Sequence, residues 1–188
     1  NKLTAEEKEV LISVSIMGNF TIRQAAAMTG KETLPENLRQ LLAANDFIKF
    51  FPRENVYHIH SILRDYLQTH FYCHQPEDFQ NRALRIAGRC YAADSQLFTA
   101  ARLYYKIKDF DAILSLPFDS VYIINQREEN MFDFIKVVFD ACPEETLCKY
   151  PFVLLMFSYV MFLWGDPETF RKGCQLIDFS IKENYASL

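Results

Sequence analysis

Two short apolar runs on either side of a polar turn constrain this chain more than any other feature. Residues 47–51 are rich in aromatic side chains, and residues 56–60 alternate between apolar and polar side chains. The four residues between them read Pro-Arg-Glu-Asn, a composition that is typical of turns. The pattern predicts a β-hairpin. Since the segments around it are patterned for helices, the order of elements indicates the fold.

The first two segments before the hairpin each begin with the spacing of a capping box. Thr4 is followed by Glu7, and Thr21 is followed by Gln24. In such a pair, each side chain accepts a hydrogen bond from the other residue's backbone N–H at the start of a helix. Gly30 suits the position just after the second helix, where a left-handed backbone is common.

A third helix is predicted over residues 34–46, with Pro35 at its first helical position. Its apolar face is formed by the leucines at i, i+4, i+7 and i+8, which are Leu34, Leu38, Leu41 and Leu42. A fourth helix is predicted over residues 61–73, with Ile62, Leu63, Tyr66 and Leu67 on one side. Three helices followed by a hairpin is the winged-helix order. We therefore expect residues 1–73 to form a winged-helix domain.

Residues 74–188 are expected to form stacked α-helical hairpins, so that the fold class is mainly α. Helical patterns cover residues 77–91 and 95–107, with a further helix from Phe110 to a stop at Pro117, and another helix or two within residues 122–139. The segments 105–110 and 162–167 look like equivalent turns between helices. A helix from Pro151 to Trp164 precedes the second turn, and the helix after it is predicted to use Phe170, Cys174, Ile177 and Ile181 as its apolar face.

Composition and charge limit the classes of function. Half of the 188 residues are hydrophobic, which argues against disorder. The net charge is −4, and the predicted third helix has only Arg39 as a basic residue, against Glu36 and Asp46. Because DNA binding depends on neutralising phosphates, we expect no DNA-binding residues in this domain. The longest apolar run is shorter than a membrane span and is expected to be a buried helix, with no membrane partner.

Two further features predict the cellular location of the chain and its place in a larger protein. The five cysteines are scattered without a CxxC pair, which indicates free, mostly buried thiols and a cytoplasmic location. Helical patterns run to both ends, so the chain is expected to be an interior piece of a larger protein, with its repeat region truncated at the C-terminus.

The order of these motifs resembles a known family. Residues 37–48, the hairpin, and residues 57–67 together resemble the winged-helix segment of the large ATP-dependent LuxR-type transcription regulators, the group that includes the maltose-regulon activator. Residues 142–147, then Tyr150-Pro151, then Gly165-Asp166 resemble the start of that family's tetratricopeptide-like superhelix.

The resemblance implies a non-catalytic signal-relay role in a bacterial regulator. The expected partners are a nucleotide-binding domain and a helical sensor domain of the same chain, together with a small-molecule or protein effector. ATP or ADP would be bound by the parent protein, and this segment would hold no cofactor of its own. DNA would be contacted only by a C-terminal helix-turn-helix domain outside this chain, and a homodimer through the exposed end of the repeats is allowed.

The resemblance also singles out one residue. The segment 59–65 is similar to the Met-His-Asp motif of related signalling ATPases, in which a winged-helix histidine contacts the phosphate of bound ADP. His60 matches this histidine and is the predicted nucleotide-sensing residue, whereas Ser61 departs from the aspartate. The alternative is that His60 only caps the fourth helix or packs in the core.

Other chemistry is less well supported by the sequence. All four histidines lie within residues 58–74, and His70, His74 and Cys73 could share a helix, but no complete set of metal ligands is present. Residues 30–33 read Gly-Lys-Glu-Thr but lack the first glycine of a phosphate loop. No catalytic residues are therefore predicted, and an enzyme or a metalloprotein ranks last. The main alternative is a stand-alone winged-helix DNA-binding protein with a helical dimerisation region.

Overall fold

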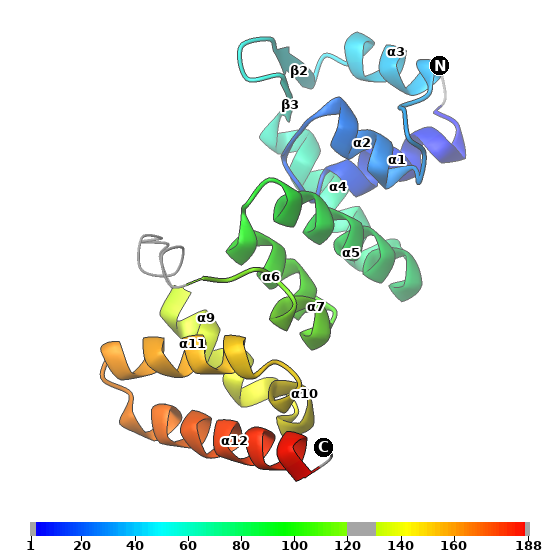
Figure 1. Ribbon diagram of the computed structural model, residues 1–188. Helices are drawn as coiled ribbons and strands as arrows, with labels where there is room; N and C mark the ends of the chain where they lie inside the picture. Colours follow the sequence, from blue (N-terminus) through cyan, green and yellow to red (C-terminus); the bar gives the residue numbers. More distant parts are fainter. Residues whose placement is uncertain (1–2, 120–130, 187–188) are drawn as a thin grey trace. The chain divides into compact units, whose positions relative to one another are not determined.

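The computed structural model of the chain describes residues 3–119 and 131–186 (Figure 1). It contains two compact units, residues 1–94 and 95–188. The first unit combines five helices with a small sheet, and the described part of the second is helical. The predicted fold class, a winged helix followed by helical hairpins, is confirmed.

The first unit begins with α1 (Ala5–Val14) and α2 (Ile22–Met28), and both start with the predicted capping boxes. Thr4 Oγ1 accepts from the Glu7 N–H at 3.2 Å, and the Glu7 carboxylate accepts from the Thr4 N–H at 2.8 Å. Thr21 and Gln24 repeat this exchange at 3.2 and 2.7 Å. Gly30 follows α2 with a φ of 70°, as expected of the residue after a helix.

Helix α3 (Glu36–Ala44) buries Leu38 and Leu42, but the predicted place of Pro35 at its first helical position is wrong by one residue. Pro35 is the N-cap, with a ψ of 149°. Its carbonyl accepts from the Arg39 N–H at 3.0 Å. Because the ring fixes φ and leaves ψ free, proline can take an extended ψ just outside the helix.

The predicted hairpin consists of β2 (Ile48–Phe51) and β3 (Val56–Ile59), which pair antiparallel. The sequence did not predict a third strand, β1 (Asn19–Phe20), which pairs with the other edge of β3 to give the order β1-β3-β2. Two residues are too few to show the alternation of a strand. β1 is therefore defined only by its partner.

Helix α4 (Ser61–His74) buries Leu67 and Phe71, whereas Ile62 and Tyr66, two members of the predicted apolar face, are 69% and 66% exposed. That part of the prediction is wrong. Leu67 and Phe71 are one helical turn apart and lie on the face that packs into the unit, so Ile62 and Tyr66 are rotated toward solvent.

Helix α5 (Glu77–Ala93) packs against α2, and the first compact unit therefore extends to residue 94. The apolar spacing of α5 resembles that of the helices after it, so the sequence grouped α5 with them. The packing groups it with α2. The sequence placed the boundary between the winged-helix domain and the repeat region at residues 73 and 74. That boundary is defined by resemblance to a family and not by packing, so it stays a prediction.

The described part of the second unit consists of helices that pack side by side. They are α6 (Leu97–Lys106), α7 (Phe110–Leu114), α9 (Met131–Ala141), α10 (Glu144–Cys148), α11 (Pro151–Leu163) and α12 (Pro167–Ala186). Helix α6 packs on α7 and α9, and α11 packs on α9, α10 and α12. Of the helical segment predicted within residues 122–139, the part before residue 131 lies outside the described residues.

The two predicted inter-helix turns have the same local structure. Lys108 and Gly165 both have positive φ, at 56° and 80°. Asp109 and Asp166 then cap the next helices, with carboxylate oxygens that accept from the N–H groups three residues later at 3.2 and 3.0 Å. The equivalence of the turns is therefore confirmed in their backbone geometry and capping.

The predicted apolar face of α12 is wrong. Its buried residues are Thr169, Gly173, Leu176 and Ser180, whereas Phe170, Cys174 and Ile177 are half-buried and Ile181 is 46% exposed. Small side chains allow α12 to approach α11 closely. A Cβ atom on Gly173 would lie 1.9 Å from the Oγ atom of Ser158, which is fully buried on α11. The buried stripe is therefore selected by size rather than by hydrophobicity.

Candidate functional site

The outward side of the β2–β3 hairpin carries His60, the residue predicted to sense nucleotide. Cross-strand pairs share a side of the sheet, and Ile48 and Ile59 form the pair that is buried. The alternate positions face the other way and are exposed or half-exposed. We name the exposed members the hairpin outer face, and they are Phe47, Lys49, Phe51, His58 and His60.

The hairpin outer face is ordered by contacts between aromatic rings. The rings of Phe47 and His60 meet edge-to-face at 6.2 Å, and those of Phe51 and His58 do so at 6.1 Å. Phe47 is 50% exposed and Phe51 is 45% exposed. Large exposed aromatic side chains beside imidazoles and a lysine form a surface that is suited to a partner with apolar and anionic groups.

His60 stands at the start of α4 as its N-cap. Its Nδ1 atom accepts from the Ile62 N–H at 3.4 Å, a long hydrogen bond, and its backbone N–H donates to the Phe47 carbonyl at 2.8 Å. An imidazole that accepts at Nδ1 carries its proton on Nε2. The capping role is therefore present in the structure, and the exposed ring retains one donor. Whether this donor meets a nucleotide stays a prediction.

The face that a DNA-binding winged helix would use is neutral in this protein. Helix α3 carries Glu36 and Arg39, whose charges cancel. The Nε atom of Arg39 donates to the Leu34 carbonyl at 3.0 Å, so the guanidinium is held back toward its own helix. At the hairpin turn, exposed Arg53 lies beside exposed Glu54. Neither element therefore offers the clustered positive charge that phosphate contacts require.

The histidines and the cysteine of α4 are only partly brought together. The His70 and His74 rings lie 5.2 Å apart, and His70 Nδ1 is 3.1 Å from the Gln75 side-chain nitrogen. His58 and His60 lie on the hairpin outer face. Within residues 3–119 and 131–186, no group of three or more His, Cys, Asp or Glu side chains could hold a metal ion.

The Gly-Lys-Glu-Thr segment has a structural explanation. Gly30 ends α2, and Lys31 forms an ion pair with Glu6 of α1 at 2.7 Å. A phosphate loop would instead join a strand to the start of a helix. The segment therefore follows the end of α2 and contacts α1 through an exposed ion pair.

The aromatic residues of the second unit divide between core and surface. Tyr104, Phe118 and Phe139 are buried, Phe132 stacks on Trp164 at 5.3 Å, and Tyr105 meets Phe134 edge-to-face at 5.9 Å. Tyr104, Phe118 and Phe139 therefore belong to the core of the second unit.

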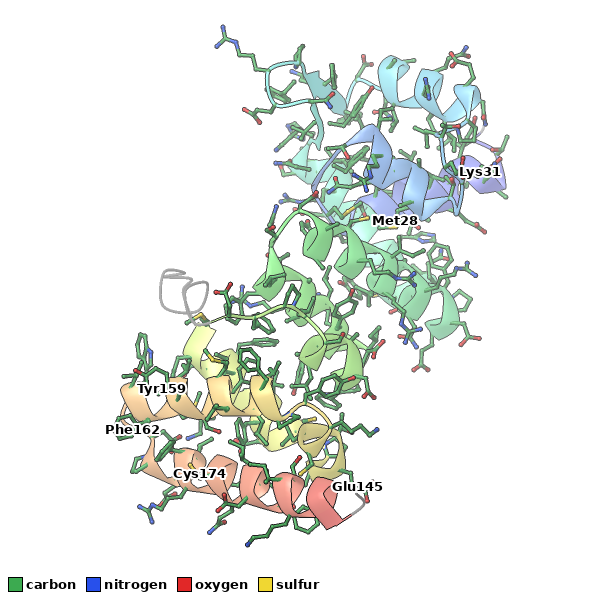
Figure 2. The ribbon with its side chains drawn as sticks, in the orientation of Figure 1. Met28, Lys31, Glu145, Tyr159, Phe162 and Cys174 are labelled. Atoms are coloured by element: carbon green, nitrogen blue, oxygen red, sulfur yellow. The ribbon has the colours of Figure 1, made fainter. Side chains whose placement is uncertain are left out.

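Helix α11, expected to be buried, has one exposed apolar side. Its exposed residues recur at helical spacing and include Phe152, Leu155, Tyr159 and Phe162, of which the last two are labelled in Figure 2. The opposite side packs on α9 and α12. None of the described helices combines the length and the apolar character needed to cross a bilayer.

Among the described residues of the second unit, Asp166 and Cys142 have the pKa values that are shifted furthest. A hydrogen bond from Lys136, supported by the backbone and hydroxyl of Thr169, lowers the pKa of Asp166 to about 2. Burial, with a smaller contribution from Asp111, raises the pKa of the Cys142 thiol to about 11. Both groups lie at helix junctions, which indicates a structural role. Of the five cysteines, only Cys142 is buried, so the expectation of mostly buried thiols is wrong, although all five are free.

Comparison with known protein families gives a match for most of the first unit. Residues 1–79 match the family model described as the MalT winged helix domain. This match confirms the resemblance of the winged-helix segment that the sequence suggested. No curated protein and no solved structure matches the chain.

Proposed function

Residues 1–79 form a winged-helix domain of the MalT type, and from this premise we propose that the chain is a signal-relay segment of a LuxR-type, ATP-dependent bacterial transcription regulator. In this proposal the segment is non-catalytic. It joins a nucleotide-binding domain to a tetratricopeptide-like sensor region, and a separate C-terminal domain binds DNA.

The hairpin outer face is the observation that carries the proposal. It is exposed, aromatic and free of carboxylates, and it presents the Nε2–H donor of His60. Such a surface suits the nucleotide-binding domain, where His60 would donate to a phosphate oxygen of ADP. A relay requires that the contact differ between two states of the protein, so that nucleotide and effector both bias one equilibrium.

The test uses the full-length gene product purified with bound ADP. His60→Asn keeps a side chain that caps helices well and removes the imidazole donor, so it separates the two roles of the residue. A hydrogen bond to a charged group contributes about 1.5–3 kcal/mol, so we expect ADP to bind roughly ten- to a hundredfold more weakly. Basal transcription should rise, while the melting temperature of the ADP-free protein is unchanged.

His58→Asn is the matched control, because His58 lies on the same hairpin outer face but does not cap α4. It should retain ADP as the unchanged protein does. Unchanged ADP retention in His60→Asn, or equal loss in both variants, would contradict the assignment of His60.

The DNA-binding alternative makes a different prediction. If α3 read the major groove, the chain would bind duplex DNA with an affinity that falls steeply with salt. The neutral charge of α3 leads us to expect no tight binding in a fluorescence titration. Tight, salt-sensitive binding would favour the alternative over the relay.

A further inference from the structure

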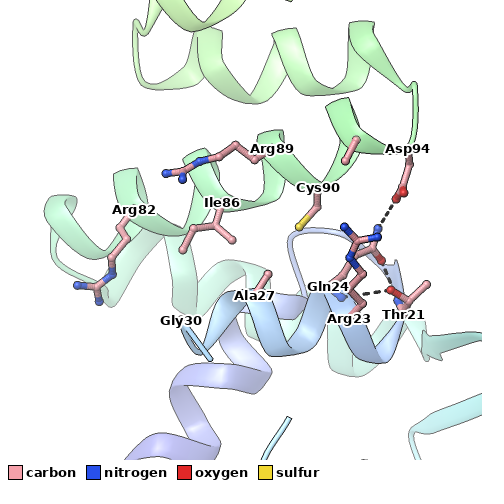
Figure 3. A pocket seen from close by; sticks show the side chains of 11 residues that line it. Thr21, Arg23, Gln24, Ala27, Gly30, Arg82, Ile86, Arg89, Cys90 and Asp94 are labelled. Atoms are coloured by element: carbon pink, nitrogen blue, oxygen red, sulfur yellow. Dashed lines mark hydrogen bonds between the residues drawn. The ribbon is translucent and has the colours of Figure 1, made fainter. Parts of the chain in front are cut away.

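A hollow of about 510 Å³ lies between α2 and α5 in the first unit (Figure 3). One side of α5 lines it with residues at helical spacing, which are Arg82, Ile86, Arg89, Cys90 and Ala93. Helix α2 contributes Arg23, Gln24 and Ala27, with Thr21 and Gly30 at its two ends. The volume is in the range of about 300–1,000 Å³ that is common for small-molecule sites.

The hollow is positively charged although the chain as a whole is acidic. Three arginines line it, and its single carboxylate is Asp94. The Asp94 carboxylate is already engaged, because it accepts from the Gln24 Nε2 amide at 2.7 Å. Figure 3 shows this bond at the Thr21 end of the hollow, with Arg82 and Gly30 at the other end.

Arg23 and Arg89 have no carboxylate within ion-pair distance among the residues that the structure describes. Arg82 lies over the Phe79 ring at 5.6 Å and borders an adjoining hollow that also contains Glu6 and Glu9. The carboxylates of Glu6 and Glu9 thus partly offset the positive charge of Arg82. Arg23 and Arg89 are therefore the two guanidiniums left to meet an anion.

The floor between the arginines is apolar. Ala27, Ile86 and Ala93 supply methyl and methylene groups, and the Cys90 thiol lies among them. Burial, followed by the charge of Asp94, raises the pKa of Cys90, while Arg23 and Arg89 act in the opposite direction. Figure 3 shows the two side chains on different sides of Cys90, with Arg23 beside Gln24 and Arg89 toward Ile86.

From this combination we propose that the α2–α5 hollow binds a small organic anion, with an apolar body on the floor and a phosphate or carboxylate group held by Arg23 and Arg89. Guanidinium groups form paired, charge-assisted hydrogen bonds with both kinds of anion. The site is separate from the hairpin outer face and does not depend on the proposed relay function.

The experiment is an NMR titration of this chain with 1-naphthyl phosphate, 1-naphthoate and inorganic phosphate. The naphthyl anions should shift the Nε–H signals of Arg23 and Arg89 and the amide signals of Ala27 and Ala93 along one saturable curve. Inorganic phosphate should bind at least tenfold more weakly, because it leaves the floor empty. The tighter of the two naphthyl anions identifies the preferred acidic group.

Variants separate a built site from general surface charge. The double variant Arg23→Gln/Arg89→Gln should weaken binding at least tenfold. The matched control is Arg85→Gln, on α5 but outside the hollow, and it should change binding less than twofold. All three arginines are exposed, so these variants should fold. Equal weakening by Arg85→Gln, equal affinity for inorganic phosphate, or the absence of a saturable shift would overturn the proposal.

Discussion

The close approach of α12 to α11 predicts that a single methyl group at Gly173 destabilises the second unit. Glycine inside a helix is normally improved by alanine, which gains up to about 1 kcal/mol in helix propensity. Gly173→Ala should do the reverse. The new Cβ would lie 1.9 Å from Ser158 Oγ, 2.9 Å from Ser158 Cβ and 3.1 Å from Phe139 Cζ.

None of these neighbours can move at low cost. Ser158 and Phe139 are fully buried, and the Ser158 hydroxyl donates to the Leu154 carbonyl at 2.6 Å. Overpacking a core costs about 1–3 kcal/mol, and rotating the hydroxyl away loses a hydrogen bond of about 1 kcal/mol. After the gain in propensity, Gly173→Ala should lower the free energy of unfolding by about 2 kcal/mol.

Urea denaturation followed by circular dichroism measures this change, and a double-mutant cycle tests its cause. Ser158→Gly removes the two closest atoms, so Gly173→Ala should be much less harmful in that background, with a coupling of about 2 kcal/mol. If Gly173→Ala stabilises the protein, or if its effect is the same in both backgrounds, the packing argument is refuted.

Four further results are expected. Asp166→Ala should lower the free energy of unfolding through loss of the cap of α12, whereas Asp166→Asn should lower it less, as measured in urea. Because the pKa of Asp166 is lowered to about 2 from 3.8, its charge stabilises the fold above pH 3.8, and acid titration should remove that contribution as the pH falls toward 2; a contribution unchanged at pH 2 would contradict this. With iodoacetamide at pH 8, exposed Cys73 should react first and buried Cys142, whose pKa is raised to about 11, should react last, by mass spectrometry of peptides. Gly30→Ala meets no atom within 4 Å but requires a φ of 70°, so it should cost about 1 kcal/mol from backbone strain alone, and a neutral result would contradict that origin.

Local signals in the sequence were enough to predict much of the first unit. The capping pairs at Thr4 and Thr21 exchange hydrogen bonds within a few residues, so their spacing alone shows where the helices begin. The hairpin is equally local. The strand β1 is different, because its two residues become a strand only through distant His58 and Tyr57.

Packing between distant segments was harder to predict. The buried side of α12 contains Gly173 and Ser180, which a hydrophobicity pattern ranks below the half-exposed Phe170 and Ile177. The packing depends on the size of the α12 side chains that face α11. The sequence of α12 alone does not show that α11 is its neighbour.

The candidate sites show the same division. His60 could be singled out from the sequence because its motif is contiguous, and the structure adds its exposed ring and the cap of α4. The α2–α5 hollow could not, because Arg23 and Arg89 lie on helices far apart in the chain. The sequence does show a local basic excess around Arg89, with Arg82 and Arg85 nearby, but nothing in it links that segment to Arg23.

The relay account is tested most directly by determining the sequence of the gene on both sides of this segment. It predicts a GxxxxGK[ST] phosphate loop in an upstream nucleotide-binding domain and a helix-turn-helix domain downstream. An open reading frame that encodes neither domain would contradict the relay account, and a stand-alone scaffold or DNA-binding protein would become the better explanation.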